Sequence, residues 1–312
     1  MDKTVQVLQI ILPVIIMLAL GMLCRRKQLI SEEGVGNIKR LLVNICIPAV
    51  VFKTFYSTRF SPRSFVLVVI LFAVTVAALR IGGVLNGRLR INEDYFPYLC
   101  TSIEGGMMGF ALFILLFGQN ELYHLALLDL GNALVLFPVL VTRLRLRQAG
   151  EKTSRADVAR SLVTPINVAI ALGILISVTG LGGVVTGSSF GMVLDAVLSF
   201  VGGPVSALIL LVVGYGLSFE RVRWNRTLRT IAARVVIMGI FGTAVFLIAW
   251  ALFPQDIIYR YGVIMAFVLP PSYMYSMFTR DESEEAYVGA VLALYTVITI
   301  IGFIILTIIS AG

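Results

Sequence analysis

The chain has 312 residues, of which 59% are hydrophobic and only 13% are charged, and its formal net charge is +8. A soluble globular domain carries roughly 25% charged residues because it must cover its surface with them, so this composition excludes an ordinary soluble domain. The excess positive charge lies in clusters between apolar segments, which points to a membrane and away from nucleic acid as the partner.

Ten apolar segments follow one another along the chain, each bounded by charged or turn-forming residues. A helix needs about 20 mostly apolar residues to cross a bilayer core of roughly 30 Å, and lipid offers the backbone no hydrogen-bond partners. The segments are continuous rather than alternating, which favours helices over barrel strands. The predicted spans are residues 5–24, 36–57, 64–86, 95–117, 122–142, 162–181, 190–215, 230–253, 260–279 and 285–309.

Basic residues are distributed unevenly between the two sides that ten alternating spans define. One side has only Lys3, Lys53, Arg59, Arg63 and Arg260, and the other side has the remaining 20 of the 25 Lys and Arg. The positive-inside rule places the richer side in the cytoplasm. We therefore predict a multi-pass protein of the plasma membrane, with both termini outside and the loop 143–161 in the cytoplasm.

The longest polar stretch divides the ten segments into two sets of five. We expect residues 1–147 to form a first five-helix repeat, residues 148–160 a cytoplasmic linker, and residues 161–312 a second five-helix repeat. Because five is odd, the two repeats would have opposite orientations, which is the plan of many secondary transporters. The predicted fold class is therefore an all-α polytopic membrane protein with two inverted repeats.

The fourth and ninth segments contain sequences that are unfavourable for a continuous helix. Glu104 is followed by several glycines, each of which costs about 1 kcal/mol relative to alanine in a helix interior. Pro270 and Pro271 lack backbone donors and push the preceding residue out of the α region. Paired breaks in corresponding segments indicate a transporter's binding site, where freed N–H groups can hold an anion; two ordinary kinks are the alternative. The expected substrate-binding residues are Asn44, Pro48, Glu104, Gly105, Gly106, Pro270, Pro271 and Ser272.

Glu104 is the most unusual single residue, because a carboxylate near the bilayer centre is costly and usually faces a cavity or a partner. Two roles stay open for it: coupling of transport to a proton or sodium ion, or bracing of the helices as a neutral or paired side chain. Asp129 and Asn132 are further coupling candidates, with packing as the alternative. Asn44, four residues before Pro48, either binds substrate or hydrogen-bonds a freed carbonyl. The three scattered cysteines argue against a metal cluster, and no cofactor is expected beyond a coupling ion.

Six motifs, in order along essentially the whole chain, resemble those of the auxin efflux carrier family and its bacterial members. They are GMLCRRKQLISEE, IKRLLVNICIPAVVF, TSIEGGMMGFALF, TPINVAIALGILIS, GGPVSALILLVVGYGLSF and LPPSYM. The resemblance implies ten spans in two inverted repeats, with the fourth and ninth helices crossing at their breaks, and transport of small carboxylates such as auxin, malate or malonate. One departure is that Gly105 stands about where the family often has an asparagine near a proline.

We therefore expect a secondary active transporter of a small organic anion, a mono- or dicarboxylate or an auxin-like acid. The alternatives are a membrane-embedded enzyme or a channel. An enzyme is not favoured, because the sequence has no HExxH or GxSxG motif and its one histidine, His124, falls in a short outer loop. A channel would normally show a filter-like or charged-ring signature. The expected partners are the organic anion and the lipid bilayer, with a homodimer left open.

Overall fold

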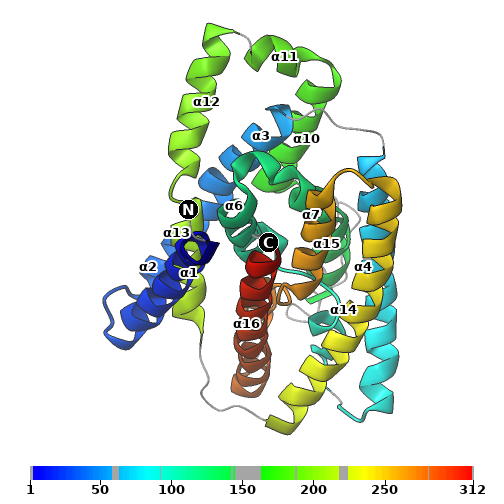
Figure 1. The fold of residues 1–312 in the computed structure, drawn as a ribbon. Helices are drawn as coiled ribbons and strands as arrows, with labels where there is room; N and C mark the ends of the chain where they lie inside the picture. The colour runs from blue at the N-terminus through cyan, green and yellow to red at the C-terminus, as the bar shows by residue number, and fades with distance from the viewer. Residues whose placement is uncertain are drawn as a thin grey trace.

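A computed structural model gives the fold of the chain (Figure 1). It describes residues 3–57, 63–91, 93–141, 143–144, 163–186, 188–217, 224–279 and 281–310. Every regular element in these ranges is helical, as the predicted fold class requires. The elements are α1 (Lys3–Arg26), α2 (Glu32–Leu41), η1 (Leu42–Cys46), α3 (Ile47–Ser57), α4 (Ser64–Arg88), α5 (Phe96–Leu99), η2 (Gly105–Gly109), α6 (Phe110–Phe117), η3 (Gln119–Glu121), α7 (Tyr123–Val135), η4 (Leu136–Val141), α10 (Pro165–Val178), α11 (Leu181–Thr186), α12 (Ser189–Gly202), α13 (Val205–Gly216), α14 (Trp224–Leu252), α15 (Ile257–Val268), η5 (Tyr273–Phe278) and α16 (Glu282–Ser310).

Six helical stretches in the described ranges are long and apolar enough to cross a membrane, which places the chain among helical membrane proteins. They are Val7–Arg26, Glu32–Ser57, Arg63–Arg88, Ser189–Gly216, Trp224–Leu252 and Glu282–Ser310. These stretches correspond to the first, second, third, seventh, eighth and tenth predicted segments. Their outer faces carry many exposed aliphatic side chains, as expected of helices that meet lipid rather than water.

The other four predicted segments are shorter or broken. The fourth is divided into α5 and α6, with a non-helical stretch and the π-helical turn η2 between them, and the ninth is divided into α15 and the short 3₁₀ helix η5. The fifth runs from α7 into the π-helical turn η4, and the sixth, α10, has only 14 residues. Glycine and proline account for the two divided segments, because they disfavour the helix at these positions.

The helices form two groups on either side of the molecule (Figure 1). In the first group α1 packs along α13, and α3 packs against α10 and α12. In the second group α4 packs along α7 and α5, and α14 packs against α15 and α16. The helix α6 lies between the groups and contacts α13. The predicted linker, residues 148–160, lies outside the described residues.

Small residues set the closest helix contacts in the first group. A Cβ atom added to Gly21 of α1 would lie within 3.0 Å of backbone atoms of α13, and one added to Gly214 of α13 would lie within 3.0 Å of the backbone of α1. In the same way, a Cβ atom on Gly173 of α10 would lie 2.6 Å from the Cβ of Phe55 in α3. Close backbone approach at small residues is the usual basis of helix association in membranes, so these glycines bring both helix pairs together.

Candidate functional site

The two chain breaks contact each other directly, which confirms the predicted contact between the fourth and ninth segments. The backbone N–H of Glu104 donates to the carbonyl oxygen of Pro270 at 2.9 Å. The N–H of Tyr273 donates to Oε2 of Glu104 at 2.6 Å, and the N–H of Ser272 donates to Oγ of Ser102 at 3.3 Å. Segments about 170 positions apart in the sequence therefore complete each other's hydrogen bonds.

Each break follows from its local sequence. The helix α15 ends because Leu269 is extended, with φ −61° and ψ 151°, as the residue before a proline usually is. Glu104 has φ −91° and ψ 66°, outside the helical region, and the π-helical turn η2 begins immediately after it. The backbone N–H of Gly109 donates back to the carbonyl of Glu104 at 3.0 Å, so the chain re-enters a helix through one wide turn.

A side chain from the next segment satisfies the backbone of each break. Asn132 of α7 accepts from the N–H of Ile103 at 3.3 Å and donates to its carbonyl at 3.1 Å. Thr299 of α16 donates to the carbonyl of Val268 at 2.7 Å. Both side chains are buried, where an unpaired backbone group is costly. Asn132 was expected as a coupling candidate, and in the structure its amide is used to hold the first break.

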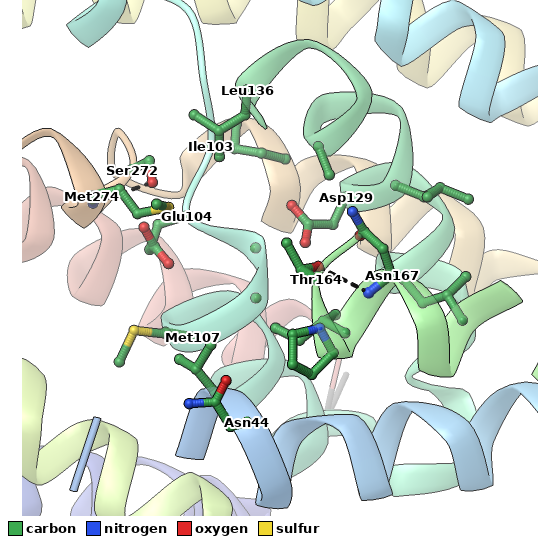
Figure 2. A pocket seen from close by; sticks show the side chains of 18 of the residues that line it. Asn44, Ile103, Glu104, Met107, Asp129, Leu136, Thr164, Asn167, Ser272 and Met274 are labelled. Carbon is green, nitrogen blue, oxygen red and sulfur yellow. Dashed lines mark hydrogen bonds between the residues drawn. The ribbon is translucent and has the colours of Figure 1, made fainter. Parts of the chain in front are cut away.

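A cavity of about 500 Å³ lies beside the crossing of the two breaks. Its polar wall comes from several elements, and the rest of its described lining is apolar. Figure 2 shows Glu104, Asp129, Asn44 and Asn167 around this one opening, each carried by a different part of the chain. The volume and the mixture of polar and apolar walls suit a small molecule with one polar end.

The structure brings most of the predicted site residues to this cavity. The predicted residues that line it are Asn44, Glu104, Gly105, Gly106, Asp129 and Ser272. The remaining predicted residues, Pro48, Pro270, Pro271 and Asn132, are not among its described lining. The proline pair acts instead through the backbone that it breaks, and Pro48 follows the π-helical turn η1 within the second segment. Asn44 both lines the cavity and donates from Nδ2 to the carbonyl of Arg40 at 2.8 Å.

Asp129 packs directly on Gly105. A Cβ atom at position 105 would lie within 3.0 Å of the Oδ1, Cγ and Cβ atoms of Asp129. Its Oδ1 also accepts from Nδ2 of Asn132 at 3.1 Å. Glycine at position 105 therefore lets α7 approach the first break closely enough for its carboxylate to enter the cavity wall.

The N-terminal end of α10 lines the cavity. Thr164, its N-cap residue, accepts from the N–H of Asn167 at 3.1 Å, and both residues line the cavity. A helix N-terminus carries a partial positive charge, which favours an anion. The two carboxylates of Glu104 and Asp129 act in the opposite sense, and none of the described lining residues is basic. The cavity thus combines features that hold an anion with features that hold a cation.

Arg234 is not among the predicted site residues and contributes only to the charge count of the cytoplasmic side. Its side chain is 0% exposed and contacts both breaks. Its guanidinium donates to the carbonyl oxygens of Leu99, Ser102 and Leu269 at 2.7, 2.8 and 3.0 Å. The signal in the sequence was an arginine inside an otherwise apolar run of the eighth segment, which normally indicates a buried partner or a functional role.

The position of His124 also differs from the prediction. It was expected in an outer loop, but it lies in the first turn of α7 and is 1% exposed. Its Nε2 is 3.1 Å from Oδ2 of Asp256, and its Nδ1 is 2.9 Å from the carbonyl oxygen of Glu121. The ring of Tyr259 meets it edge-on, and the Tyr259 hydroxyl is 2.7 Å from Oγ of Ser64. This cluster ties the first turn of α4 to those of α7 and α15.

The Asp256–His124 contact predicts a pH-dependent contribution to stability. Burial alone would raise the pKa of Asp256, but the hydrogen bond and charge of His124 and the N–H groups of Ile258 and Tyr259 hold this pKa below its ordinary value of 3.8. A carboxyl whose pKa is lower in the folded state stabilises the fold above its unfolded pKa, and this contribution is lost as the pH falls through the folded pKa.

The Asp256→Asn variant should therefore unfold in detergent at a lower temperature than the wild type at pH 7, with a loss of about 1 kcal/mol or less because the carboxylate is partly exposed. The difference should shrink as the pH falls below about 4. Thermal unfolding followed across this pH range measures it, with the exposed Glu285→Gln change as control. A difference that stays constant with pH would contradict the assignment.

Comparison with known proteins does not identify a family for this chain. No protein-family model matches the chain, and no curated protein matches it.

Proposed function

We propose that this chain is a secondary active transporter that carries a small organic anion across the plasma membrane, as the auxin efflux carriers that it resembles do. The observation that supports this most directly is the pair of interrupted helices that meet beside a cavity of about 500 Å³. Secondary transporters commonly build their substrate sites from such discontinuous helices. The substrate would be a mono- or dicarboxylate or an auxin-like acid.

The packing of the helices supports two inverted repeats, residues 1–147 and 161–312. The first segment of each half packs on the second segment of the other half, as α1 on α13 and α10 on α3. The fifth segment of each half holds the break of the fourth through a side chain, Asn132 in one half and Thr299 in the other. A two-fold axis between the halves requires that each contact recurs with the two halves interchanged, as these contacts do. Ten spans, with both termini outside and the loop 143–161 in the cytoplasm, belong to the same proposal.

The cavity chemistry supports a coupled carrier. The N-terminal end of α10 would hold the carboxylate of the substrate through its partial positive charge, and the apolar lining would contact the carbon skeleton of the substrate. An anion that enters a space with two carboxylates is repelled unless a cation accompanies it or a carboxyl takes up a proton. Glu104 and Asp129 are therefore the proposed sites of the coupling proton or sodium ion. Movement of one helix group against the other would expose the cavity to each side in turn.

The proposal is tested with purified protein in proteoliposomes and a panel of labelled aliphatic and aromatic mono- and dicarboxylates. We expect saturable uptake of at least one acid that an inward proton or sodium gradient increases. Asn44→Trp, which narrows the cavity, should lower this uptake, whereas Ile45→Trp, at an exposed neighbour outside the described lining, should not. Flux that does not saturate would favour a channel, a chemically altered product would favour an enzyme, and no uptake of any acid by folded protein would refute the anion proposal.

A further inference from the structure

Arg234 is a fully buried arginine that joins the two chain breaks. Its Nη1 donates to the carbonyl of Leu99, before the first break, at 2.7 Å. Its Nη2 donates to the carbonyl of Ser102, inside that break, at 2.8 Å and to the carbonyl of Leu269, at the start of the second break, at 3.0 Å. One side chain of α14 thus contacts both interrupted segments at their backbones.

Two of these three carbonyls belong to the C-terminal ends of helices. Leu99 is the last residue of α5 and Leu269 is the C-cap residue of α15, and the final carbonyls of a helix have no donor within the helix. The C-terminal end of α15 also carries a partial negative charge that favours a cation. A planar guanidinium can bond several such oxygens at once in a fixed geometry, whereas a lysine ammonium is a single point charge.

Among the described residues, the guanidinium of Arg234 bonds these carbonyls and forms no ion pair with an acidic side chain. Within the described part of the chain, none of the ion pairs includes Arg234. Its guanidinium carbon lies 4.8 Å from the centre of the Tyr295 ring of α16, which is a favourable place for a cation. Its Nε has no hydrogen-bond partner among the described residues, so all of its described hydrogen bonds go to carbonyls at the two breaks or just before the first one.

We propose that Arg234 is a positioning residue for the transport site: it holds the two breaks in one arrangement and thereby keeps Glu104 and Ser272 in place at the cavity. This inference rests on the proposed function for its effect on transport, but its effect on the breaks does not. Both cavity residues lie within a few positions of the carbonyls that Arg234 binds, and their backbones bond across the crossing. A purely structural arginine would stabilise the whole fold without a special effect on these two segments.

The test uses Arg234→Lys, which keeps the charge but loses the planar fork, and Arg229→Lys as a matched control at an exposed site on the same helix. Amide hydrogen exchange is measured by mass spectrometry on the full-length protein in detergent. We expect faster exchange in peptides that cover 99–104 and 268–273 in Arg234→Lys only. Equal acceleration in α1 and α13 would indicate general destabilisation, and unchanged exchange in both breaks would overturn the proposal.

Transport gives a second readout. For an acid that the wild type carries, Arg234→Lys should raise KM about tenfold or more, because a small displacement of positioned groups has large effects, while the maximal rate changes less. An unchanged KM would contradict the positioning role. If the wild type carries none of the acids tested, the proposed function fails, and the exchange measurement alone still decides the role of Arg234.

A second pair of variants covers the case in which Arg234→Lys does not fold. Tyr295→Leu removes the ring beside the guanidinium and leaves Arg234 in place, and Tyr295→Phe keeps the ring. The leucine variant should accelerate exchange in both breaks and the phenylalanine variant should not. If both variants leave the breaks as protected as in the wild type, the proposal is wrong.

Discussion

A Gly105→Ala variant is expected to lose both stability and transport. The added Cβ would lie within 3.0 Å of three atoms of Asp129, including its Cγ and Cβ. Because these atoms are near the base of the side chain, a change of rotamer cannot remove the clash, and α7 itself has to shift. Overpacking of a buried site typically costs about 1–3 kcal/mol, and here the shift would also disturb the bonds between Asn132 and Ile103.

The neighbouring glycine provides the control for stability. At position 106 the nearest atom to an added Cβ is Oδ2 of Asp129 at 3.7 Å, an ordinary contact, so Gly106→Ala should unfold at nearly the temperature of the wild type. A double variant that combines Gly105→Ala with Asp129→Gly removes all three of these contacts and should recover most of the thermal stability of the Asp129→Gly single variant. Equal unfolding temperatures of Gly105→Ala and Gly106→Ala would show that the close approach of α7 does not matter.

A Glu104→Gln variant is expected to fold and to bind substrate but to lose accumulation driven by an ion gradient. The glutamine oxygen can still accept the hydrogen bond from the N–H of Tyr273, and the backbone bond to Pro270 is unchanged. The substitution keeps the size of the side chain and removes its charge and its ability to take up a proton. Exchange of substrate for substrate, which needs no net movement of the coupling ion, should continue.

Glu104→Ala separates this effect from packing. It leaves the N–H of Tyr273 without its acceptor in a buried place, which should cost about 1–3 kcal/mol, so the alanine variant should be less stable than the glutamine variant. Uptake and exchange in proteoliposomes, together with unfolding temperatures, distinguish the two. Gradient-driven uptake by Glu104→Gln with the pH dependence of the wild type would show that Glu104 braces the helices and does not couple transport.

Local sequence was sufficient to predict a helical membrane protein and both helix breaks. In lipid a continuous apolar segment must satisfy its own backbone hydrogen bonds, and a helix does this within the segment. Glycine and proline disfavour the helix only within a few residues of their own positions. The stretch after Glu104 and the pair Pro270–Pro271 therefore interrupt their helices wherever those helices lie in the molecule. The same information could not tell which predicted segments form long continuous helices, since π-helical turns and short helices depend on packing.

The sequence by itself determined a helical membrane protein, two interrupted helices, and a carboxylate at one of the breaks. Only the tertiary structure decided which individual groups meet: the backbone of Glu104 bonds that of Pro270, and Asp129 enters the cavity wall at Gly105. Arg234, which the charge count placed on the cytoplasmic side, is buried and bonds both breaks. His124 changed in the same way, from a loop residue to a buried partner of Asp256. The physical reason is that the environment of a polar side chain is set by residues far away in the chain, whereas helix breaking is set by its immediate neighbours.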